Sequence, residues 1–284
     1  MPSAEVANSP LWRGGARSVT GWSATMKKIM ITGEAGYIAQ KLQRRLLADG
    51  YDAECVSVRG EVLSDLTGYD VIVHCAALVH AKRRDKQEYY KINSELTRRL
   101  ALEFKRSGGG QFVFLSTMAV FGKDGSLRKR EVIGADTPLR PINDYGKSKL
   151  AAEEALRQME DESLSVAILR PPIVYGENCP GNYRMLELAA RFAPVFPLVH
   201  NQRSMLHVDR LCGIISSIIR EDKRGTFHPQ DAHYHCTSKI VKRIAASNGR
   251  NIALSRMLGK FVCLVNISLI RKVFGNLVYS KTFE

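Results

Sequence analysis

The sequence predicts an α/β fold in which a doubly wound parallel sheet is followed by a smaller C-terminal subdomain. Short apolar runs alternate with amphipathic stretches through residues 26–176, as expected of repeated βα units. A glycine-rich turn joins the first apolar run to the first amphipathic stretch. Hydroxyl groups and a Tyr/Lys pair follow later runs. They would reach the carboxyl edge of the sheet, where such sheets bind ligands.

Composition places the chain among ordinary globular proteins. Of its 284 residues, 45% are hydrophobic and 25% are charged, and no apolar run reaches the ~18 residues of a membrane-spanning helix. The six cysteines are scattered and form no C-x-x-C pair. Their spacing argues against a metal site or a disulfide framework and indicates the reducing cytosol. Residues 1–25 are rich in Ser, Gly and Ala without a signal-peptide core, so we expect a disordered extension.

The net charge of +14 is concentrated near the C-terminus. Residues 239–284 contain nine Lys and Arg and a single acid, Glu284. The simplest interpretation is a set of solvated helix faces. The next is a surface that attracts anions, either a nucleotide diphosphate or acidic lipid. The apolar run at residues 261–270 adds a peripheral membrane contact to the expectations. A nucleic-acid partner is not predicted, because no basic run is interleaved with aromatic residues.

The first predicted unit is a strand at residues 28–32, a turn at 33–39 and a helix at 40–49. The turn follows the spacing T-G-x-x-G-x-x-A, with glycines at Gly33 and Gly36. Glycine lets a backbone approach a pyrophosphate closely, and the helix N-terminus supplies free N–H groups and a positive dipole. A purely structural turn would use similar residues, but this context favours a dinucleotide-binding (Rossmann) loop.

The second strand, predicted at residues 52–58, bears on the choice of dinucleotide. An acid near the end of this strand binds the ribose 2′-hydroxyl of NAD in many such folds. Here the position holds Arg59, with Glu61 beyond it. An arginine can pair with a 2′-phosphate or stack on adenine. This position therefore leaves NAD versus NADP open and tilts toward tolerance of NADP, while NAD stays the first expectation for the cofactor.

The third strand, predicted at residues 69–78, ends in small side chains. Cys75, Ala76 and Ala77 would let the backbone pass close to a dinucleotide. We interpret Cys75 as a small apolar filler rather than a nucleophile, because no base is placed to activate it.

A helix is predicted at residues 85–106, and a fourth strand follows at 112–115. Asn93 lies near the apolar stripe of this helix, where it is either solvated or buried so that it positions the backbone of the site. Ser116 and Thr117 follow the fourth strand directly. Hydroxyl groups at this end of a strand lie where α/β sheets bind ligands.

Tyr145 and Lys149 stand four residues apart at the start of a helix-like run that continues to Met159. At this spacing two side chains lie on one face of a helix. A fixed ammonium ion stabilises a phenolate, so we expect Lys149 to lower the pKa of Tyr145 from its ordinary value near ~10 and make it a general base. A solvated helix start would carry the same spacing, but the glycine turn and the hydroxyl groups favour a catalytic pair.

The alternation of strands and helices ends after a fifth strand at residues 165–169. A further amphipathic helix is predicted at 208–220. The predicted domains are a dinucleotide-binding domain (26–176, with 205–222 returning to it) and a substrate-binding subdomain (177–204 and 223–284) that is C-terminally short.

The sequence resembles the extended short-chain dehydrogenases/reductases, and among them the NAD-dependent epimerase/dehydratase family with its UDP-glucose 4-epimerase-like members. The resemblance covers about residues 26–260. It implies a cytoplasmic enzyme of surface-polysaccharide synthesis that binds a UDP-linked sugar, and a homodimer. The motifs that carry it are TGEAGYIA (32–39), HCAA (74–77), LSTMAVFG (115–122), YGKSK (145–149), RPPIVYG (170–176) and NQRSMLHVDRL (201–211).

The resemblance also implies roles by position. Thr117 would hydrogen-bond the sugar, with Ser116 as a second hydroxyl. Tyr145 would take the proton of the C4 hydroxyl, and Lys149 would hold the nicotinamide ribose. The other implied contacts are with the dinucleotide (Gly33, Gly36, Tyr37, Ile38, Arg59, Cys75, Ala76, Ala77, Ser116, Tyr145, Lys149 and Pro172) and with the substrate diphosphate (Asn182 and Arg203).

Three activities remain open at this point. The first is a C4 epimerase with a transient 4-keto sugar, and the second is an NAD(P)H-dependent 4-ketoreductase of a UDP-deoxy-amino sugar, which Arg59 favours. The third is a non-catalytic dinucleotide sensor. A dehydratase is disfavoured, because Met118 and Ala119 stand where such enzymes use an Asp-Glu pair. Ile173 replaces an Asn that contacts the nucleotide sugar in relatives, which leaves the sugar undetermined.

Overall fold

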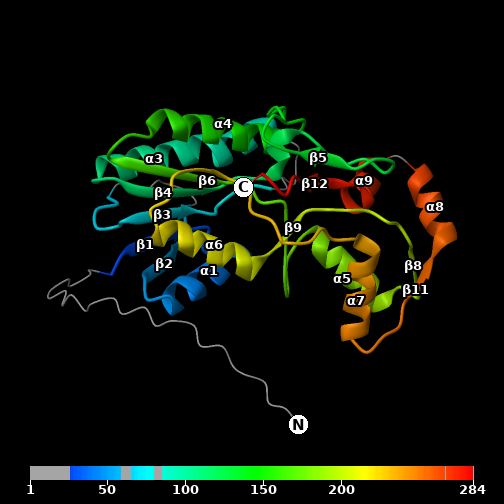
Figure 1. The fold of residues 1–284 in the computed structure, drawn as a ribbon. Helices are drawn as coiled ribbons and strands as arrows, with labels where there is room; N and C mark the ends of the chain where they lie inside the picture. Colours follow the sequence, from blue (N-terminus) through cyan, green and yellow to red (C-terminus); the bar gives the residue numbers. More distant parts are fainter. Residues whose placement is uncertain (1–25, 59–64, 80–84, 266, 284) are drawn as a thin grey trace, which may run out of the picture.

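A central sheet of six parallel strands organises the computed structural model, which describes residues 26–58, 65–79, 85–265 and 267–283 (Figure 1). Across the sheet the strands follow the order β10 (Gly225–Phe227), β6 (Leu164–Leu169), β4 (Gly110–Leu115), β3 (Val71–His74), β1 (Lys28–Thr32) and β2 (Asp52–Val56). Because β2 and β3 lie on opposite sides of β1, the winding of the chain reverses there. Ligands bind at the carboxyl ends of the strands at such a switch point.

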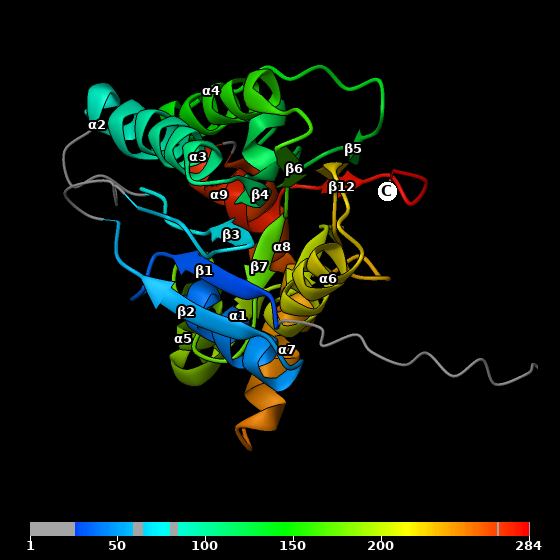
Figure 2. The same ribbon diagram turned by 90° about the vertical axis from the view of Figure 1, so that its left-hand side faces the viewer.

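Helices cover both faces of this sheet (Figures 1 and 2). One face packs against α1 (Tyr37–Ala48) and α6 (Val208–Arg220), and the other against α3 (Leu96–Arg106) and α4 (Asp144–Met159). Alternation along β1 shows how the sequence produces two cores: Ile29 and Ile31 pack with α1 and α6, whereas Met30 packs with α3 and α4. A parallel sheet buried on both faces is what the continuous apolar strands predict.

The helix predicted at residues 85–106 consists of three consecutive segments. α2 (Lys86–Tyr90) leads into a π-helical turn, η1 (Lys91–Glu95), and then into α3. The Asp85 side chain caps the start by accepting a hydrogen bond from the Gln87 N–H at 2.8 Å. π-turns are rare and are frequent at functional sites, and this one contains Asn93.

The strand at 28–32 and the helix at 208–220 have the predicted bounds. Two corrections concern short strands. β10 pairs with β6 in the main sheet, although its residues were expected in the smaller subdomain. β5 (Glu131–Ile133), where no strand was predicted, pairs with β12 (Leu277–Tyr279). Both strands find their partners far along the chain, which a local sequence pattern cannot reveal.

The smaller part of the molecule lies at one end of the sheet and has its own apolar core around Phe196, Val241 and Phe274 (Figure 1). The helices of this smaller part are α5 (Asn182–Phe192), α7 (Thr237–Ser247), α8 (Arg256–Leu264) and α9 (Ser268–Phe274). Two parallel strand pairs accompany them: β7 (Ile173–Tyr175) with β9 (Met205–His207), and β8 (Val195–Pro197) with β11 (Ala253–Ser255).

None of the helices in the described ranges combines the length and apolar character needed to cross a bilayer.

Candidate active site

The glycine turn after β1 packs against the chain that follows β3. Gly33 has φ +90°, and a Cβ there would lie 3.2 Å from the backbone nitrogen of Ala76. Gly36 stands at the N-cap of α1 and donates its N–H to the Gly33 carbonyl at 2.6 Å. The first N–H groups of a helix have no intrahelical partner. The turn therefore offers backbone donors and a helix dipole to an anion at the switch point.

Tyr37 and Ile38 open α1, and both side chains pack against the apolar core between α1, α6 and the sheet. The Tyr37 hydroxyl donates to the Glu177 carbonyl at 2.9 Å. Burial raises the pKa of Tyr37 to about 12. The ring thus ties α1 to the chain beyond β7. A pyrophosphate contact of Tyr37 would be made by its backbone N–H group.

A buried histidine fixes the ends of β1 and β3. His74 Nδ1 lies 2.7 Å from the Thr32 hydroxyl, which also accepts the Ala76 N–H at 3.1 Å. Its Nε2 lies 3.0 Å from the Thr97 hydroxyl. Thr97 donates its own proton to the Asn93 carbonyl, so the imidazole donates through Nε2. Burial lowers the pKa of His74 to about 3, which keeps it neutral.

Asn93 is fully buried, so the solvated alternative for this residue is wrong. Its amide oxygen accepts the Leu78 N–H at 2.7 Å, and its amide nitrogen donates to the Leu78 carbonyl at 2.9 Å. The same nitrogen donates to the Ser148 hydroxyl at 3.0 Å, and Ser148 donates to the Tyr145 carbonyl. Asn93 therefore joins the loop after β3 to the helix that carries Tyr145.

Thr117, which follows β4, and Tyr145, in the first turn of α4, lie close together at the sheet edge. Burial raises the pKa of Tyr145 to about 12, and the Thr117 hydroxyl opposes this rise. Asn143 caps α4 by accepting the Gly146 N–H at 2.7 Å. A Cβ at Gly146 would lie 2.8 Å from the Ala119 carbonyl, so glycine allows α4 to approach the turn after β4.

Lys149 is buried beneath this pair, with 1% of its surface exposed. Its Nζ lies 3.9 Å from the centre of the Phe114 ring in β4. Burial lowers the pKa of Lys149 to about 7, against the influence of Cys75 and Glu153. The expectation that Lys149 lowers the pKa of Tyr145 is not met here, because burial dominates at both groups and disfavours both charged forms.

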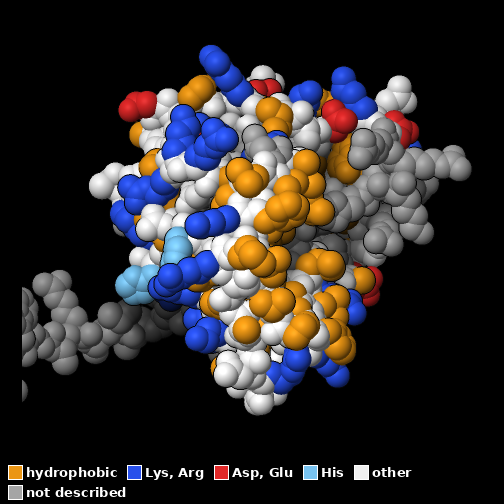
Figure 3. All heavy atoms as spheres, turned by 90° about the vertical axis from the view of Figure 1, so that its right-hand side faces the viewer, with side chains coloured by type: hydrophobic (Ala, Val, Ile, Leu, Met, Phe, Trp, Pro, Cys, Tyr) orange, Lys and Arg blue, Asp and Glu red, His pale blue; other side chains and the backbone are white. Residues whose placement is uncertain are grey.

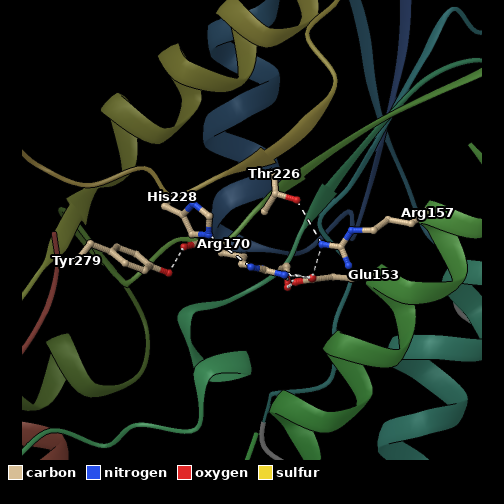
Figure 4. A network of polar contacts seen from close by, with 7 residues as sticks. Glu153, Arg157, Arg170, Thr226, His228 and Tyr279 are labelled. Carbon is tan, nitrogen blue, oxygen red and sulfur yellow. Dashed lines mark hydrogen bonds and ion pairs between the residues drawn. The ribbon is translucent and has the colours of Figure 1, made fainter. Parts of the chain in front are cut away.

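Ser116 hydrogen-bonds to a buried ion pair that the sequence patterns did not indicate. Glu153 and Arg170 form this pair (Figure 4). The Ser116 hydroxyl donates to Glu153, which lies four residues after Lys149 on α4. Arg170, after β6, donates to the same carboxylate from Nε at 3.0 Å. The Ser116 hydroxyl is thus committed to Glu153, and Thr117 remains as the hydroxyl beside Tyr145. The signal for Glu153 was its spacing on the helix face of Tyr145 and Lys149.

Other predicted cofactor contacts lie along the same edge. Burial raises the pKa of Cys75 to about 12, which agrees with a filler rather than a thiolate. Ala76 touches the glycine turn, and Ala77 is exposed after it. Pro172 is buried between β6 and β7. Arg59 lies outside the described residues. In the described part of the chain, no group of His, Cys, Asp and Glu side chains is arranged to hold a metal ion.

A separate pocket brings together two positions singled out for the substrate, Arg203 and Ile173. Arg203 is 7% exposed and donates through Nη1 to the carbonyls of Arg271 and Gly275 at 3.0 and 3.2 Å. Its buried Nε has no hydrogen-bond partner among the described residues. Asn182 begins α5, and its side chain lies outside the described structure. The lining residues are Ile173, Tyr183, Leu186, Arg203, Met205, Thr237, Ile240, Lys272 and Val273.

Comparison with known proteins agrees with this geometry. The model of the NAD dependent epimerase/dehydratase family matches residues 29–227. A UDP-glucose 4-epimerase of Vibrio cholerae is 28% identical over 255 residues, which are 80% of this chain and 77% of the relative. An N-acetyl-alpha-D-glucosaminyl-diphospho-ditrans,octacis-undecaprenol 4-epimerase of Escherichia coli O157:H7 is 29% identical over 224 residues, or 69% of this chain and 64% of the relative.

Solved structures show the same fold. The crystal structure of dTDP-4-dehydrorhamnose reductase from Bacillus anthracis in complex with NADP superposes with a TM-score of 0.68 at 21% identity. The superposition covers 82% of this chain and 85% of the reductase.

Proposed function

The chain belongs to the NAD dependent epimerase/dehydratase family, and on this premise we propose that it is a C4 epimerase of a nucleotide-linked sugar. The observation that carries the proposal is the closeness of Thr117 and Tyr145 at the sheet edge, with Lys149 one turn further along the same helix. A protein that only senses a dinucleotide needs no general base, so the intact set favours an enzyme.

The residues at the switch point fit a dinucleotide. Gly33 keeps open a space beside Ala76 that a Cβ would crowd, and the N-terminus of α1 directs N–H groups toward a pyrophosphate. When bound, NAD or NADP would supply the acceptor and donor of hydride at C4 of the sugar. The protein's part is to hold the sugar and to move the proton of its C4 hydroxyl.

Tyr145 is the proposed acid and base for that proton. At neutral pH its hydroxyl carries a proton, because its pKa is about 12. It can act as a base only where the phenolate is stabilised. The nearby Thr117 hydroxyl lowers its pKa, and protonation of Lys149 on the same helix face would add a positive charge. Tyr145 would accept the C4 proton as the ketone forms and return it when the epimer is made.

Arg203 supports a diphosphate-containing substrate. Its buried Nε has no hydrogen-bond partner among the described residues, and a guanidinium suits a diphosphate. By similarity to the Vibrio epimerase we propose a UDP-linked sugar. The likeness to a reductase bound to NADP, together with Arg59, supports the second candidate, a 4-ketoreductase. A cytosolic location and a homodimer through α3 and α4 are further proposals from the resemblance.

The deciding experiment uses UDP-glucose and UDP-N-acetylglucosamine deuterated at C4, incubated with the purified protein and NAD but no reductant. An epimerase gives the C4 epimer with the deuterium retained at C4, because hydride returns to the same carbon. A ketoreductase gives no epimer and oxidises NADPH only with a 4-keto sugar. Nuclear magnetic resonance of the product distinguishes the two outcomes.

The matched variant is Tyr145→Phe, which keeps the ring and removes the hydroxyl. We expect kcat to fall by about 10²–10⁴-fold, the usual contribution of a general acid–base group. The thermal shift caused by NAD should remain, because the dinucleotide contacts are unchanged. Full turnover by Tyr145→Phe would rule out every catalytic form of the proposal.

A further inference from the structure

The outer side of α8 is an apolar face that the proposed reaction does not use. Met257, Phe261 and Leu264 are 77%, 64% and 77% exposed, at a spacing of four and then three residues. This spacing places them on one side of the helix. Ile267 and Leu269, 53% and 64% exposed, continue the surface toward α9. We call these five residues the apolar face. Figure 3 shows hydrophobic side chains gathered at this end of the molecule.

The inner side of α8 explains why this face points outward. Gly259 is buried, and a Cβ there would collide with the Leu198 carbonyl of the chain next to β8. Val262 and Cys263 pack on the core of the smaller part. The helix is therefore held tightly on one side, and its exposed apolar stripe cannot turn inward.

Basic residues predominate around this face, although Asp124, from a distant part of the sequence, lies 3.8 Å from Arg271 of α9. Residues 237–283 contain nine Lys and Arg and no Asp or Glu. Arg256 and Lys260 are exposed on α8 itself, next to the apolar stripe. Figure 3 shows Lys and Arg side chains beside and below the hydrophobic ones. A solvated helix would place polar residues of both signs on this side.

We propose that the apolar face docks the protein peripherally on an anionic lipid bilayer. Helices that lie in a membrane interface combine exposed large apolar side chains with Lys and Arg at the level of the lipid phosphates. A second copy of the chain fits less well, because it would bring two basic surfaces together. An anionic bilayer satisfies both the apolar stripe and the positive charge.

The test is flotation of the full-length chain with vesicles of phosphatidylcholine and phosphatidylglycerol, compared with phosphatidylcholine alone. We expect binding only to the anionic vesicles and its loss at high salt. The variant Phe261→Gln/Leu264→Gln should lower the binding constant at least about tenfold, since each exposed side chain would no longer enter the bilayer. Lys260→Gln with Arg256→Gln should weaken binding and its salt dependence.

The controls are Leu47→Gln and Arg44→Gln on α1, outside the face, where Leu47 is 51% exposed. They should bind vesicles like the wild type. The thermal shift with NAD checks that each variant is folded. The proposal is overturned if the wild type does not float, or if Phe261→Gln/Leu264→Gln floats equally well. It is also overturned if light scattering shows a wild-type dimer that this double variant converts to monomers, because the face would then join two copies.

Discussion

Lys149 shows at the scale of one residue how burial governs the site. Its side chain lies between the Phe114 ring and the chain at Cys75, and burial lowers its pKa to about 7. An unfolded lysine keeps its ordinary value near ~10.4. Between these two pH values the unfolded chain binds more protons than the folded one. Stability should therefore rise as the pH rises through this window, since less charge has to be buried.

Replacement of Lys149 by Met tests this linkage. Lys149→Met keeps the length of the side chain without the charge, and it should unfold at higher denaturant than the wild type at pH 7. Its advantage should shrink by about 2 kcal/mol between pH 7 and pH 9, as the wild-type lysine loses its proton. Urea unfolding at both pH values measures the difference. Lys147→Met, at an exposed position on the same helix, is the control. Equal pH dependence in all three proteins would contradict the explanation.

At the scale of the element, the turn between β1 and α1 depends on close approach as well as on backbone conformation. Gly33 and Gly50 begin and end the same turn–helix unit, with φ +90° and +87°. A Cβ at Gly33 would crowd Ala76, whereas a Cβ at Gly50 has no neighbour within 4 Å. The two glycines therefore share a left-handed backbone conformation, which would be strained for any other residue, but they differ in what lies beside them.

Alanine at each position separates these two effects. Both Gly33→Ala and Gly50→Ala should cost about 1 kcal/mol or more of stability, because alanine disfavours positive φ. Only Gly33→Ala should also weaken NAD binding, by about tenfold or more, since the turn must move away from Ala76 and from the pyrophosphate. Calorimetric titration with NAD measures this directly. Unchanged affinity in Gly33→Ala would mean that the turn does not hold the dinucleotide.

Comparison of particular elements shows what the sequence could and could not predict. The strand at 28–32 and the helix at 208–220 follow from local apolar patterns and have the predicted bounds. The meeting of Thr117 with Tyr145 follows from the rule that parallel strands end at one edge. The sequence does not predict the direction of the long Lys149 side chain, because this direction depends on packing against Phe114. Ser116 was misassigned because its partner, Glu153, is distant in sequence.

At the scale of the whole molecule, Arg170 connects α4, through a buried ion pair with Glu153, to the C-terminal strand, through its backbone carbonyl. Glu153 on α4 receives hydrogen bonds from Arg170, after β6, and from Arg157 at 3.0 Å (Figure 4). The Tyr279 hydroxyl of β12 donates to the Arg170 carbonyl at 2.7 Å. His228, after β10, lies 3.4 Å from the Arg170 guanidinium. Segments far apart in the sequence thus meet around one carboxylate.

We expect that replacing one member of this ion pair costs more stability than replacing both members together. Burial raises the pKa of Glu153, but the hydrogen bonds and charge of Arg170 outweigh it, so the net pKa lies below the ordinary value. Glu153→Gln leaves Arg170, 5% exposed, without its counter-charge and should lower the free energy of unfolding by about 3–5 kcal/mol. Glu153→Gln with Arg170→Met should recover part of this loss, because no buried charge remains unpaired.

The acid dependence provides an independent readout of the same pair. Because the folded-state pKa is depressed, the contribution of Glu153 is present above the unfolded pKa near ~4.3 and is lost as the pH falls through the folded value. Urea unfolding of the wild type should therefore weaken more steeply in acid than that of Glu153→Gln. Glu154→Gln, exposed on the same helix, should stay within about 0.5 kcal/mol of the wild type. If Glu153→Gln matches Glu154→Gln, the buried ion pair does not contribute to stability.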